Sequence, residues 1–387
     1  MLHRFTRRSA LLSMIATASL TLTGCGGGNN ENANKIVVGE YGSLSGEQAT
    51  FGKTTHQGVA LAEKQINAAG GINGKELKII TLDNRSKPDE TRNTVTKLIT
   101  DDKVVALIGE VASGRSLIGA PIAQKYGVPM ISPSSTNPEV TRIGDKIFRV
   151  CFIDPDQGYA VAKFAIDNLK AKSAAILFDQ KEPYSTGLRD NFRDWFKKLG
   201  GTITTEQQYS GGDADFGAVL GSIRDSKPDV IFVPGYYNDI PNIAIQARKL
   251  GITVPLLGSD GWETENLPSR AEGKLEGCYY SNHYAPADPR PESVTFVEAF
   301  KKEYGHEPSA LAALGYDSVM LLADAIKRSP SLKGNDLADA IRNTKDFIGA
   351  TGTINFNKER NPVKPMVMIK IENGKEVYVA TINPPKD

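Results

Sequence analysis

From residue 35 onward, short runs of apolar residues alternate with segments whose apolar positions recur every three or four residues. A short apolar run predicts a buried strand, and the three-to-four spacing predicts a helix that buries one face. In the first half of the chain, strands are expected at 36–39, 77–82, 104–108 and 128–131, and the helices between them carry apolar faces at Val59, Ala62 and Ile66, at Val95, Leu98 and Ile99, and at Leu117, Ile118, Pro121 and Ile122.

The same alternation repeats in the second half of the chain. Strands are expected at 174–178, 202–209, 230–233 and 254–257, and helices at 188–199, 216–224 and 240–250. Strands that alternate with helices favour a mostly parallel sheet with helices on its faces. Two such series predict an α/β protein with two doubly wound, mostly parallel-sheet domains.

The tail of the chain breaks this alternation. Helical patterns cover 293–304 and 311–328, and residues 366–382 are typical of a hairpin that turns at Asn373-Gly374. We expect the tail to return and complete both domains.

The N-terminal segment has the layout of an export signal. Three arginines precede an uncharged run over 10–22, which is short for a membrane-spanning helix. The sequence Leu-Thr-Gly-Cys at 22–25 resembles the lipobox of bacterial lipoproteins, so we expect a signal peptide over 1–24, lipid on Cys25 and a flexible tether over 25–34. An exported protein without lipid is the alternative, and the export route, general or twin-arginine, stays open.

Charge and cysteine content add little. Loss of the three arginines in the first 24 residues changes the formal charge from +1 to −2, and a nearly neutral protein has no electrostatic basis for binding nucleic acid. Cys151 and Cys278 are the cysteines that remain after Cys25. Their spacing in the sequence leaves open whether they form a disulfide.

The loops that follow the predicted strands are the places to look for a ligand site. In open α/β sheets, ligands bind beyond the carboxyl ends of the strands, where loops lead into helix N-termini. The loops of the first series are rich in serine, threonine and glycine, and those of the second series carry tyrosines and an acid. The loops concerned are SLSG at 43–46, EVASG at 110–114 and SPSST at 132–136, then EPY at 182–184, GYY at 235–237 and SDGW at 259–262.

These two sets of loops complement the two ends of a zwitterion. Several neutral donors and a helix N-terminus suit a carboxylate, whereas a carboxylate and aromatic faces suit an ammonium. We therefore expect Asp260 to pair with an ammonium, and an α-carboxylate to be held by Ser113, Ser134, Ser135 and Thr136. The alternative is that these residues only cap helices, as serine, threonine and aspartate commonly do.

Several stretches of the chain are motifs of one known family. They are SLSGEQATFG, INAAGGINGKEL, VVALIGEVASGRS, VPMISPSSTNPEVT, FDQKEPYSTGL, VIFVPGYYND and LLGSDGW. On these motifs, which span nearly all of the chain after the N-terminal segment, the protein resembles the leucine/isoleucine/valine-binding family of substrate-binding proteins that serve ABC importers.

The resemblance implies the periplasmic binding protein type I fold. Two lobes would be joined by a hinge of three crossings, with a first ligand-binding lobe formed by 35–150 plus 284–352 and a second by 151–283 plus 353–387. It further implies that Ser113 and Thr136 hold the ligand carboxylate, with the backbone at Ser134 close to the ammonium.

The remaining family positions line the same cleft. Asp260 corresponds to the acid that pairs with the ammonium, where the best-known member has a glutamate, one methylene longer. The resemblance implies that Tyr184 and Tyr236 close over the ligand, that Phe51 contributes an aromatic ring from the first lobe, and that the side-chain pocket is lined by Val111 and Ala112.

Motifs for catalysis are weak. GEQATFGKT at 46–54 has five residues between its glycines rather than the four of a phosphate-binding loop, and Gly-x-Ser-x-Gly does not occur. His56, His283 and His306 are isolated in the sequence and not spaced as metal ligands. We therefore expect no enzyme activity, cofactor or metal.

The sequence as a whole predicts an extracytoplasmic receptor that captures a small amino acid, aliphatic or branched-chain, between two lobes and delivers it to an ABC-importer permease. We expect a monomer that the lipid on Cys25 anchors at the outer face of the cytoplasmic membrane or in the periplasm. Alternatives are a sensor with a signalling partner, a receptor for amides, urea-like solutes or aromatic acids, and, less favoured, a cleft hydrolase.

Overall fold

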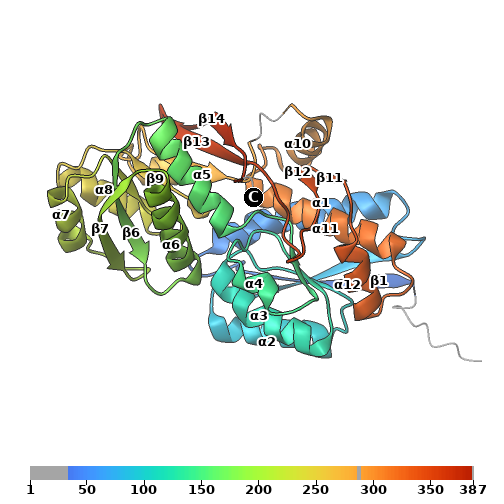
Figure 1. Ribbon diagram of the computed structural model, residues 1–387. Helices are drawn as coiled ribbons and strands as arrows, with labels where there is room; N and C mark the ends of the chain where they lie inside the picture. The colour runs from blue at the N-terminus through green and yellow to red at the C-terminus, as the bar shows by residue number, and fades with distance from the viewer. Residues whose placement is uncertain (1–33, 286–288, 386–387) are drawn as a thin grey trace, which may run out of the picture.

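The computed structural model describes residues 34–285 and 289–385, folded into two lobes that are each built around a sheet (Figure 1). The predicted signal peptide, lipid-bearing Cys25 and nearly all of the tether lie outside the described residues. Within the described part of the chain, no helix has the length and apolar character needed to span a bilayer.

The first sheet has five strands in the order β2-β1-β3-β4-β5, and every neighbouring pair is parallel. This agrees with the α/β alternation of the sequence. The strands are β1 (Lys35–Gly42), β2 (Glu76–Asp83), β3 (Leu107–Ile108), β4 (Met130–Ser132) and β5 (Ile147–Arg149), and the helices after β1 to β4 are α1 (Ala49–Ala68), α2 (Pro88–Thr100), α3 (Ser113–Tyr126) and α4 (Glu139–Arg142).

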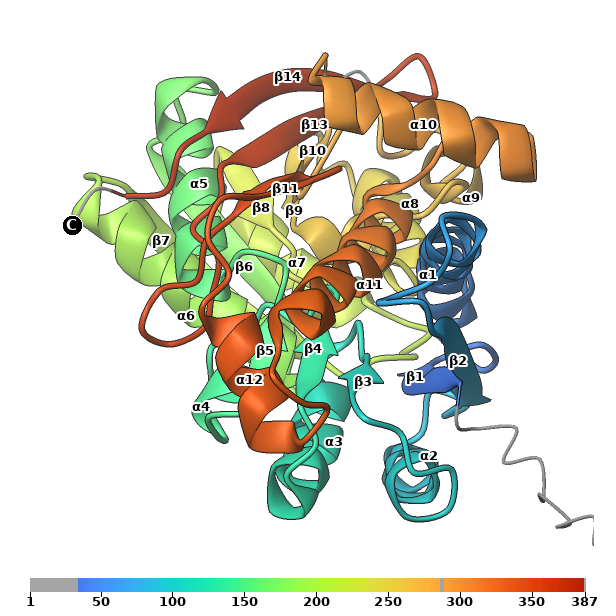
Figure 2. The same ribbon diagram turned by 90° about the vertical axis from the view of Figure 1, so that its right-hand side faces the viewer.

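Three helices of the tail return to the first lobe, where α11 lies alongside α1 (Figure 2). Glycine at position 58 permits this close approach, because a Cβ there would stand 1.8 Å from the carbonyl oxygen of Ala312. Leu314 and Leu322 of α11 join Val59 and Ile66 of α1 in one core. The helices are α10 (Pro291–Tyr304), α11 (Ala310–Arg328) and α12 (Gly334–Arg342).

The second sheet has seven strands in the order β14-β13-β10-β9-β8-β6-β7. The five from β10 to β7 are parallel, and the tail hairpin β13–β14 adds to them antiparallel, turning at Asn373 and Gly374 with positive φ as the sequence predicts. The strands are β6 (Ser173–Asp179), β7 (Thr202–Tyr209), β8 (Val230–Phe232), β9 (Leu256–Gly258), β10 (Tyr279–Asn282), β13 (Met366–Glu372) and β14 (Lys375–Ile382).

Helices cover both faces of this sheet (Figure 1), and a short 3₁₀ turn, η1, directly follows β9. The helical elements are α5 (Asp154–Asp167), α6 (Pro183–Lys198), α7 (Gly217–Asp225), α8 (Ile240–Lys249), η1 (Asp260–Trp262) and α9 (Leu267–Arg270).

The chain passes between the two sheets after β5, after β10 and after the small hairpin of β11 (Phe347–Gly349) and β12 (Gly352–Ile354). Three crossings are the number that the resemblance implies. The residue limits predicted for the lobes stay a prediction, because the crossing segments belong to neither sheet.

Both described cysteines are free and buried, so the structure contains no Cys151–Cys278 disulfide. Cys151 packs in the core of the first lobe, whereas Cys278 packs in the core of the second. The two thiols therefore lie in different cores.

Candidate ligand-binding site

An enclosed cavity lies between the lobes, and six of the predicted ligand-binding residues line it. We call it the interlobe cavity; its lining consists of Phe51, Val111, Ser134, Tyr184, Tyr236, Asp260, Gly261 and Leu311. Its volume is about 10 Å³, which is room for about one water molecule. A solute of amino-acid size can therefore enter only when the lobes move apart.

Asp260 supplies the charge of the second-lobe wall. It begins η1 directly after β9 and is 6% exposed. Its Oδ1 accepts hydrogen bonds from the Tyr184 hydroxyl at 2.6 Å and from Gln157 Nε2 at 2.8 Å, and its Oδ2 lies 2.9 Å from His283 Nε2. Among the described residues, no lysine or arginine forms an ion pair with Asp260. The carboxylate is thus held by uncharged hydrogen-bond donors and lacks a cationic partner from the described residues.

His283 also belongs to this wall, although it was not predicted from the sequence as a site residue. It follows β10 at the second crossing, is buried, and stacks on Phe152 with ring centroids 3.8 Å apart. Burial lowers the pKa of His283, although Asp260 opposes the shift. The neutral imidazole is therefore the form that donates to Asp260 near pH 7.

Three aromatic rings close the cavity from both sides. Tyr184 and Tyr236 of the second lobe stack with centroids 4.8 Å apart and planes 6° apart, and Phe51 of α1 meets the Tyr236 ring edge-on at 5.6 Å. The Tyr184 hydroxyl also accepts a hydrogen bond from Gly261 N at 2.9 Å. The hydroxyl of Tyr236 is buried and has no hydrogen-bond partner in the described part of the chain.

The first-lobe wall carries neutral hydroxyl groups. Ser134 Oγ lies 3.2 Å from His283 Nε2, and Ser113, the first residue of α3, accepts a hydrogen bond from Asn137 N at 3.3 Å. The Thr136 hydroxyl is fully buried, and within the described residues no group forms a hydrogen bond of normal geometry with it. Ser113 and Thr136 stand behind the cavity lining rather than in it.

Ser135 and Ala112 are buried and lie outside the lining of the interlobe cavity. The Ser135 hydroxyl lies 2.9 Å from the carbonyl oxygens of both Glu110 and Val111, so it links the loop at 132–136 to the loop at 110–114. The Ala112 backbone N–H donates to Glu110 Oε2 at 2.6 Å. The structure therefore does not bring these two predicted residues to the interlobe cavity.

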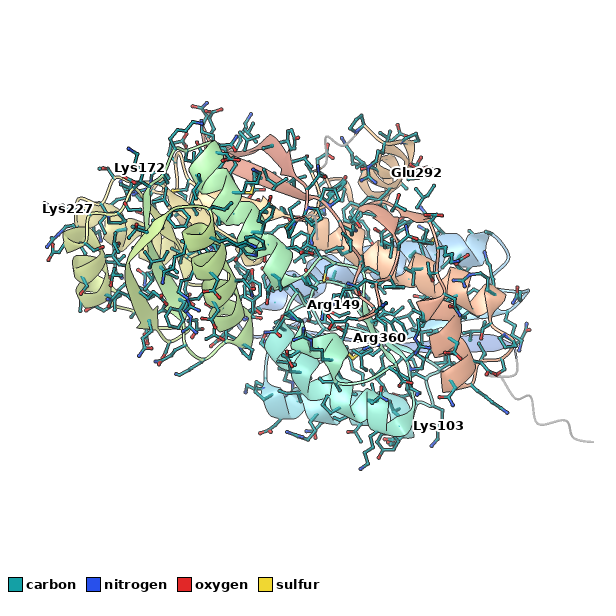
Figure 3. The ribbon with its side chains drawn as sticks, in the orientation of Figure 1. Lys103, Arg149, Lys172, Lys227, Glu292 and Arg360 are labelled. Carbon is teal, nitrogen blue, oxygen red and sulfur yellow. The ribbon has the colours of Figure 1, made fainter. Side chains whose placement is uncertain are left out.

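A buried arginine holds the loop that carries Ser134 and Thr136. Arg149, at the end of β5 and 0% exposed, donates to the backbone carbonyls of Ser135 and, at 2.8 Å, Asn137. Figure 3 places it near the centre of the molecule, in contrast to the peripheral Lys172 and Lys227. Nη2 of Arg149 also lies 3.5 Å from the Thr141 hydroxyl, and its Nε has no hydrogen-bond partner among the described residues.

Acidic residues predominate in an opening next to Tyr236. It has a volume of about 560 Å³, shares Tyr236 with the interlobe cavity, and is lined by Lys181 and by the acids Glu47, Asp179, Glu182, Asp213 and Asp239. Burial raises the pKa of Glu182 to about 7 and that of Asp239 to about 6, and neighbouring acids add to both shifts. Two carboxyl groups of this opening are therefore shifted toward the protonated form.

The site contains the residue types of a hydrolase triad without its geometry. Ser134 and Asp260 both approach Nε2 of His283, at 3.2 and 2.9 Å. A triad needs the serine and the carboxylate on opposite ring nitrogens, so that the imidazole can accept the serine proton. Across the described residues there is also no group of three or more histidine, cysteine, aspartate or glutamate side chains that could hold a metal ion.

Comparison with known proteins gives a consistent result. Residues 35–376 match the periplasmic binding protein family. The chain is 31% identical to Leu/Ile/Val-binding protein homolog 2 of Brucella abortus over 345 residues, which are 88% of this chain and 91% of that protein.

Two solved structures share the fold over nearly the whole chain. A leucine-binding protein LivK from Thermotoga maritima is 39% identical with a TM-score of 0.87, and the match covers 90% of this chain and 99% of that one. The branched-chain amino acid substrate-binding protein LivJ from Streptococcus pneumoniae, in complex with isoleucine, is 34% identical with a TM-score of 0.85, covering 90% and 100%. The chain belongs to the periplasmic binding protein family, within which it is related to the leucine/isoleucine/valine-binding proteins.

Proposed function

We propose that the protein is an extracytoplasmic receptor that captures an aliphatic L-amino acid, with a branched side chain, and delivers it to an ABC-importer permease. One observation carries this proposal: a single enclosed cavity joins the buried Asp260 carboxylate, which has only neutral donors around it, to apolar walls from the opposite lobe. The related LivJ, solved with isoleucine, supports the choice of ligand class.

The ammonium of the amino acid would sit at Asp260. A buried carboxylate attracts a cation strongly, since the low dielectric of the site weakens the charge interaction far less than water does. The flat faces of Tyr184 and Tyr236 add cation–π attraction on the same side.

The carboxylate of the amino acid would meet the first-lobe wall. The N-terminus of α3 at Ser113 offers backbone N–H groups and a positive dipole end. The buried Thr136 hydroxyl would donate a hydrogen bond to the ligand carboxylate. The backbone at Ser134 would contact the ammonium.

The side chain of the amino acid would pack against apolar groups of the first lobe. Phe51, Val111 and Leu311 supply that surface, and they come from α1, the loop before α3 and the start of α11. Because these residues are aliphatic or aromatic without charge, the pocket favours leucine, isoleucine or valine over polar amino acids.

Capture would proceed by hinge closure. Each lobe offers half of the site, and a ligand that touches both halves stabilises the closed form about the three crossings. The permease would then recognise the closed receptor. We further propose a monomer that is held at the membrane by lipid on Cys25; a radiolabelled fatty acid found on the wild type and missing from Cys25→Ser would support the anchor.

Two alternatives would change the ligand or the partner. A receptor for aromatic acids would have to place an anion beside Asp260, which has no lysine or arginine partner among the described residues, and this costs free energy. An amide or urea-like solute lacks the full charge that Asp260 would pair with. A sensor would use the same site, and only its partner would differ.

A thermal-shift screen of the purified protein against amino acids, amides and aromatic acids tests the proposal. A ligand at 100 times its dissociation constant should add about 2.7 kcal/mol to the free energy of unfolding. We expect shifts with L-leucine, L-isoleucine and L-valine. Shifts only with amides or aromatic acids would contradict the assignment of Asp260 as the ammonium partner.

A further inference from the structure

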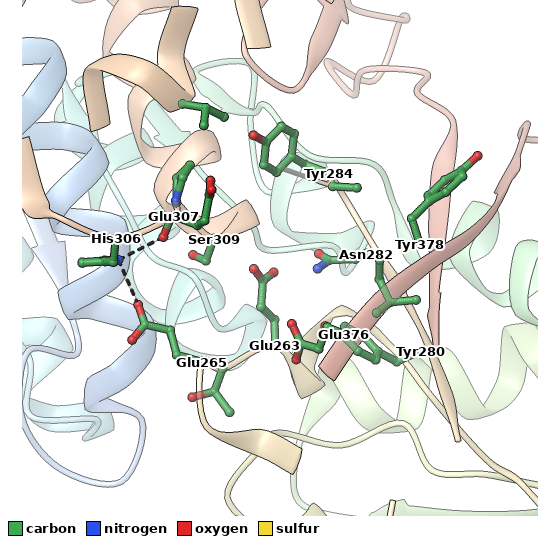
Figure 4. A pocket seen from close by; sticks show the side chains of 15 residues that line it. Glu263, Glu265, Tyr280, Asn282, Tyr284, His306, Glu307, Ser309, Glu376 and Tyr378 are labelled. Carbon is green, nitrogen blue, oxygen red and sulfur yellow. Dashed lines mark hydrogen bonds and ion pairs between the residues drawn. The ribbon is translucent and has the colours of Figure 1, made fainter. Parts of the chain in front are cut away.

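A further cavity, larger than the interlobe cavity, is lined by the residues drawn in Figure 4. We call it the hinge cavity. Its volume is about 630 Å³, within the range of small-molecule sites. Glu263, Tyr280 and Glu376 line it from the second lobe, and His306 and Ser309 line it from the segment before α11. Both lobes thus build it, as they build the interlobe cavity.

The hinge cavity contains an unsatisfied buried acid. Glu263 is 6% exposed, and its Oε1 accepts a hydrogen bond from Ala310 N at 2.5 Å. Its Oε2 is buried without a hydrogen-bond partner of normal geometry among the described residues, and its carboxyl group points into the cavity (Figure 4). Burial raises the pKa of Glu263 to about 8 and the neighbouring Glu376 adds to the shift, while the Ala310 N–H and the Asn282 side chain oppose it. Such a group needs a proton or a cation.

The rest of the lining suits a cation that carries N–H groups. Glu376, which comes from strand β14, lies beside Glu263 (Figure 4). The rings of Tyr280, Tyr284 and Tyr378 border the same space. Lysine and arginine are absent from the described lining, and His306 lies 3.5 Å from Glu265. Carboxylates and aromatic faces together favour an organic ammonium. No group of acids in the described chain has the arrangement of a metal site.

The two cavities share two structural elements. Asp260 and Gly261 of η1 line the interlobe cavity, and Glu263, at the end of the same turn, lines the hinge cavity. Leu311 lines the interlobe cavity, whereas Ser309, two residues earlier, lines the hinge cavity. The hydrogen bond from Ala310 N to Glu263 joins these elements across the lobes. The hydrogen bond between Ala310 N and Glu263 therefore lies between the elements that line the two cavities.

We propose that the hinge cavity is a second ligand site, which binds a small alkylammonium between Glu263 and Glu376 and thereby stabilises the closed arrangement of the lobes. The effect on closure rests on the proposed function, whereas the binding of the ammonium does not. An ammonium held there would satisfy Glu263 Oε2 and keep Glu263 in place on Ala310. Closure would then require less free energy from the amino acid.

Calorimetry with 1,4-diaminobutane dihydrochloride tests the site, with 1,4-butanediol as an uncharged probe of the same length. We expect saturable binding of the diamine to the purified protein, at least 10-fold weaker binding to Glu263→Gln and to Glu376→Gln, and no binding of the diol. Glu298→Gln is the matched control, because Glu298 is exposed on α10 and does not line the cavity. It should bind the diamine as the wild type does.

Two results would overturn the proposal: no saturable binding of the diamine, or binding by Glu376→Gln as tight as by the wild type. A second titration, of L-leucine with and without saturating diamine, separates this proposal from the proposed function. A several-fold gain in leucine affinity is expected in the wild type and not in Glu263→Gln. Diamine binding that depends on Glu263, without any leucine binding, would leave the hinge site standing and remove the amino-acid function.

Discussion

The two walls of the interlobe cavity use opposite kinds of polarity. On the second-lobe wall, the Asp260 carboxylate is surrounded by donors from Tyr184, Gln157 and His283, and every contact is between side chains. On the first-lobe wall, Ser113 and Thr136 offer neutral hydroxyl groups beside the N-terminus of α3.

The difference between the walls indicates which end of a zwitterion each would hold and how much each contributes. A buried charge gives a large effect when its partner is removed, whereas a neutral donor gives a small one. Substitutions on the two walls should therefore differ in how much they weaken ligand binding and in which ligand analogues still bind.

The largest effect on binding is expected on the charged wall. Asp260→Ala should weaken the binding of L-leucine by about 2 to 5 kcal/mol, because the ammonium would be buried without its counter-ion. Calorimetry measures this directly. Asp225→Ala, at the exposed end of α7, is the control and should leave the affinity unchanged. Unchanged leucine affinity in Asp260→Ala would remove this residue from the site.

A buried acid behind the neutral wall predicts a pH effect on stability. Burial raises the pKa of Asp154 to about 8, and Asp260 adds to the shift, while the Thr136 hydroxyl and Arg149 oppose it. Between about pH 4 and pH 8 the native state therefore keeps a proton that the unfolded chain has lost, so the contribution of Asp154 to stability falls as the pH rises.

Asp154→Asn removes this dependence. The free energy of unfolding of the variant, relative to the wild type, should rise between pH 4 and pH 8 by an amount on the order of a few kcal/mol, and then stay level above pH 8. Urea unfolding at a series of pH values measures the difference, and the value at pH 4 accounts for any change in packing. A difference that stays constant from pH 5 to pH 8 would contradict a raised pKa.

The neutral wall should show a smaller effect on binding. Thr136→Val removes a buried hydroxyl that lies against Asp154, and leucine should bind more weakly by about 1 to 3 kcal/mol. Combining it with Ser113→Ala should weaken leucine binding further and spare leucinamide. Equal losses for leucine and leucinamide would contradict the carboxylate assignment.

The smallest effect is expected for a donor that only supports the charged wall. Tyr184→Phe removes one of three donors to Asp260 and keeps the ring that stacks on Tyr236. Leucine should bind more weakly by about 1 kcal/mol. A loss as large as that of Asp260→Ala would mean that the hydroxyl contacts the ligand itself.

Local patterns in the sequence predicted most of the scaffold. The helix and strand periodicities located the two series of elements, and Asn373-Gly374 located the hairpin, because the signals for these features lie within a few residues of each other. The strands β5 and β10 were not predicted. β5 is Ile-Phe-Arg and β10 is Tyr-Tyr-Ser-Asn, so polar residues end the apolar run in each, although β3, β4, β8 and β9 are no longer and were predicted.

The candidate site was predictable only where it follows a recognised strand. The rule that ligands bind beyond the carboxyl ends of strands located Ser134 and Asp260. It would have located His283 had β10 been recognised, since His283 directly follows that strand. Gln157 and Leu311 follow crossings of the chain, and only the return of the tail brings Leu311 to the cavity.

The central claim is that one site holds both charges of an amino acid, and the most direct test compares L-leucine with 4-methylpentanoate, which is leucine without its ammonium group. Both would be titrated into the purified protein in the calorimeter at pH 7. The account predicts saturable binding of L-leucine and at least 100-fold weaker binding of 4-methylpentanoate. Equal affinity for the two would contradict the pairing of Asp260 with an ammonium and make the protein a receptor for carboxylic acids.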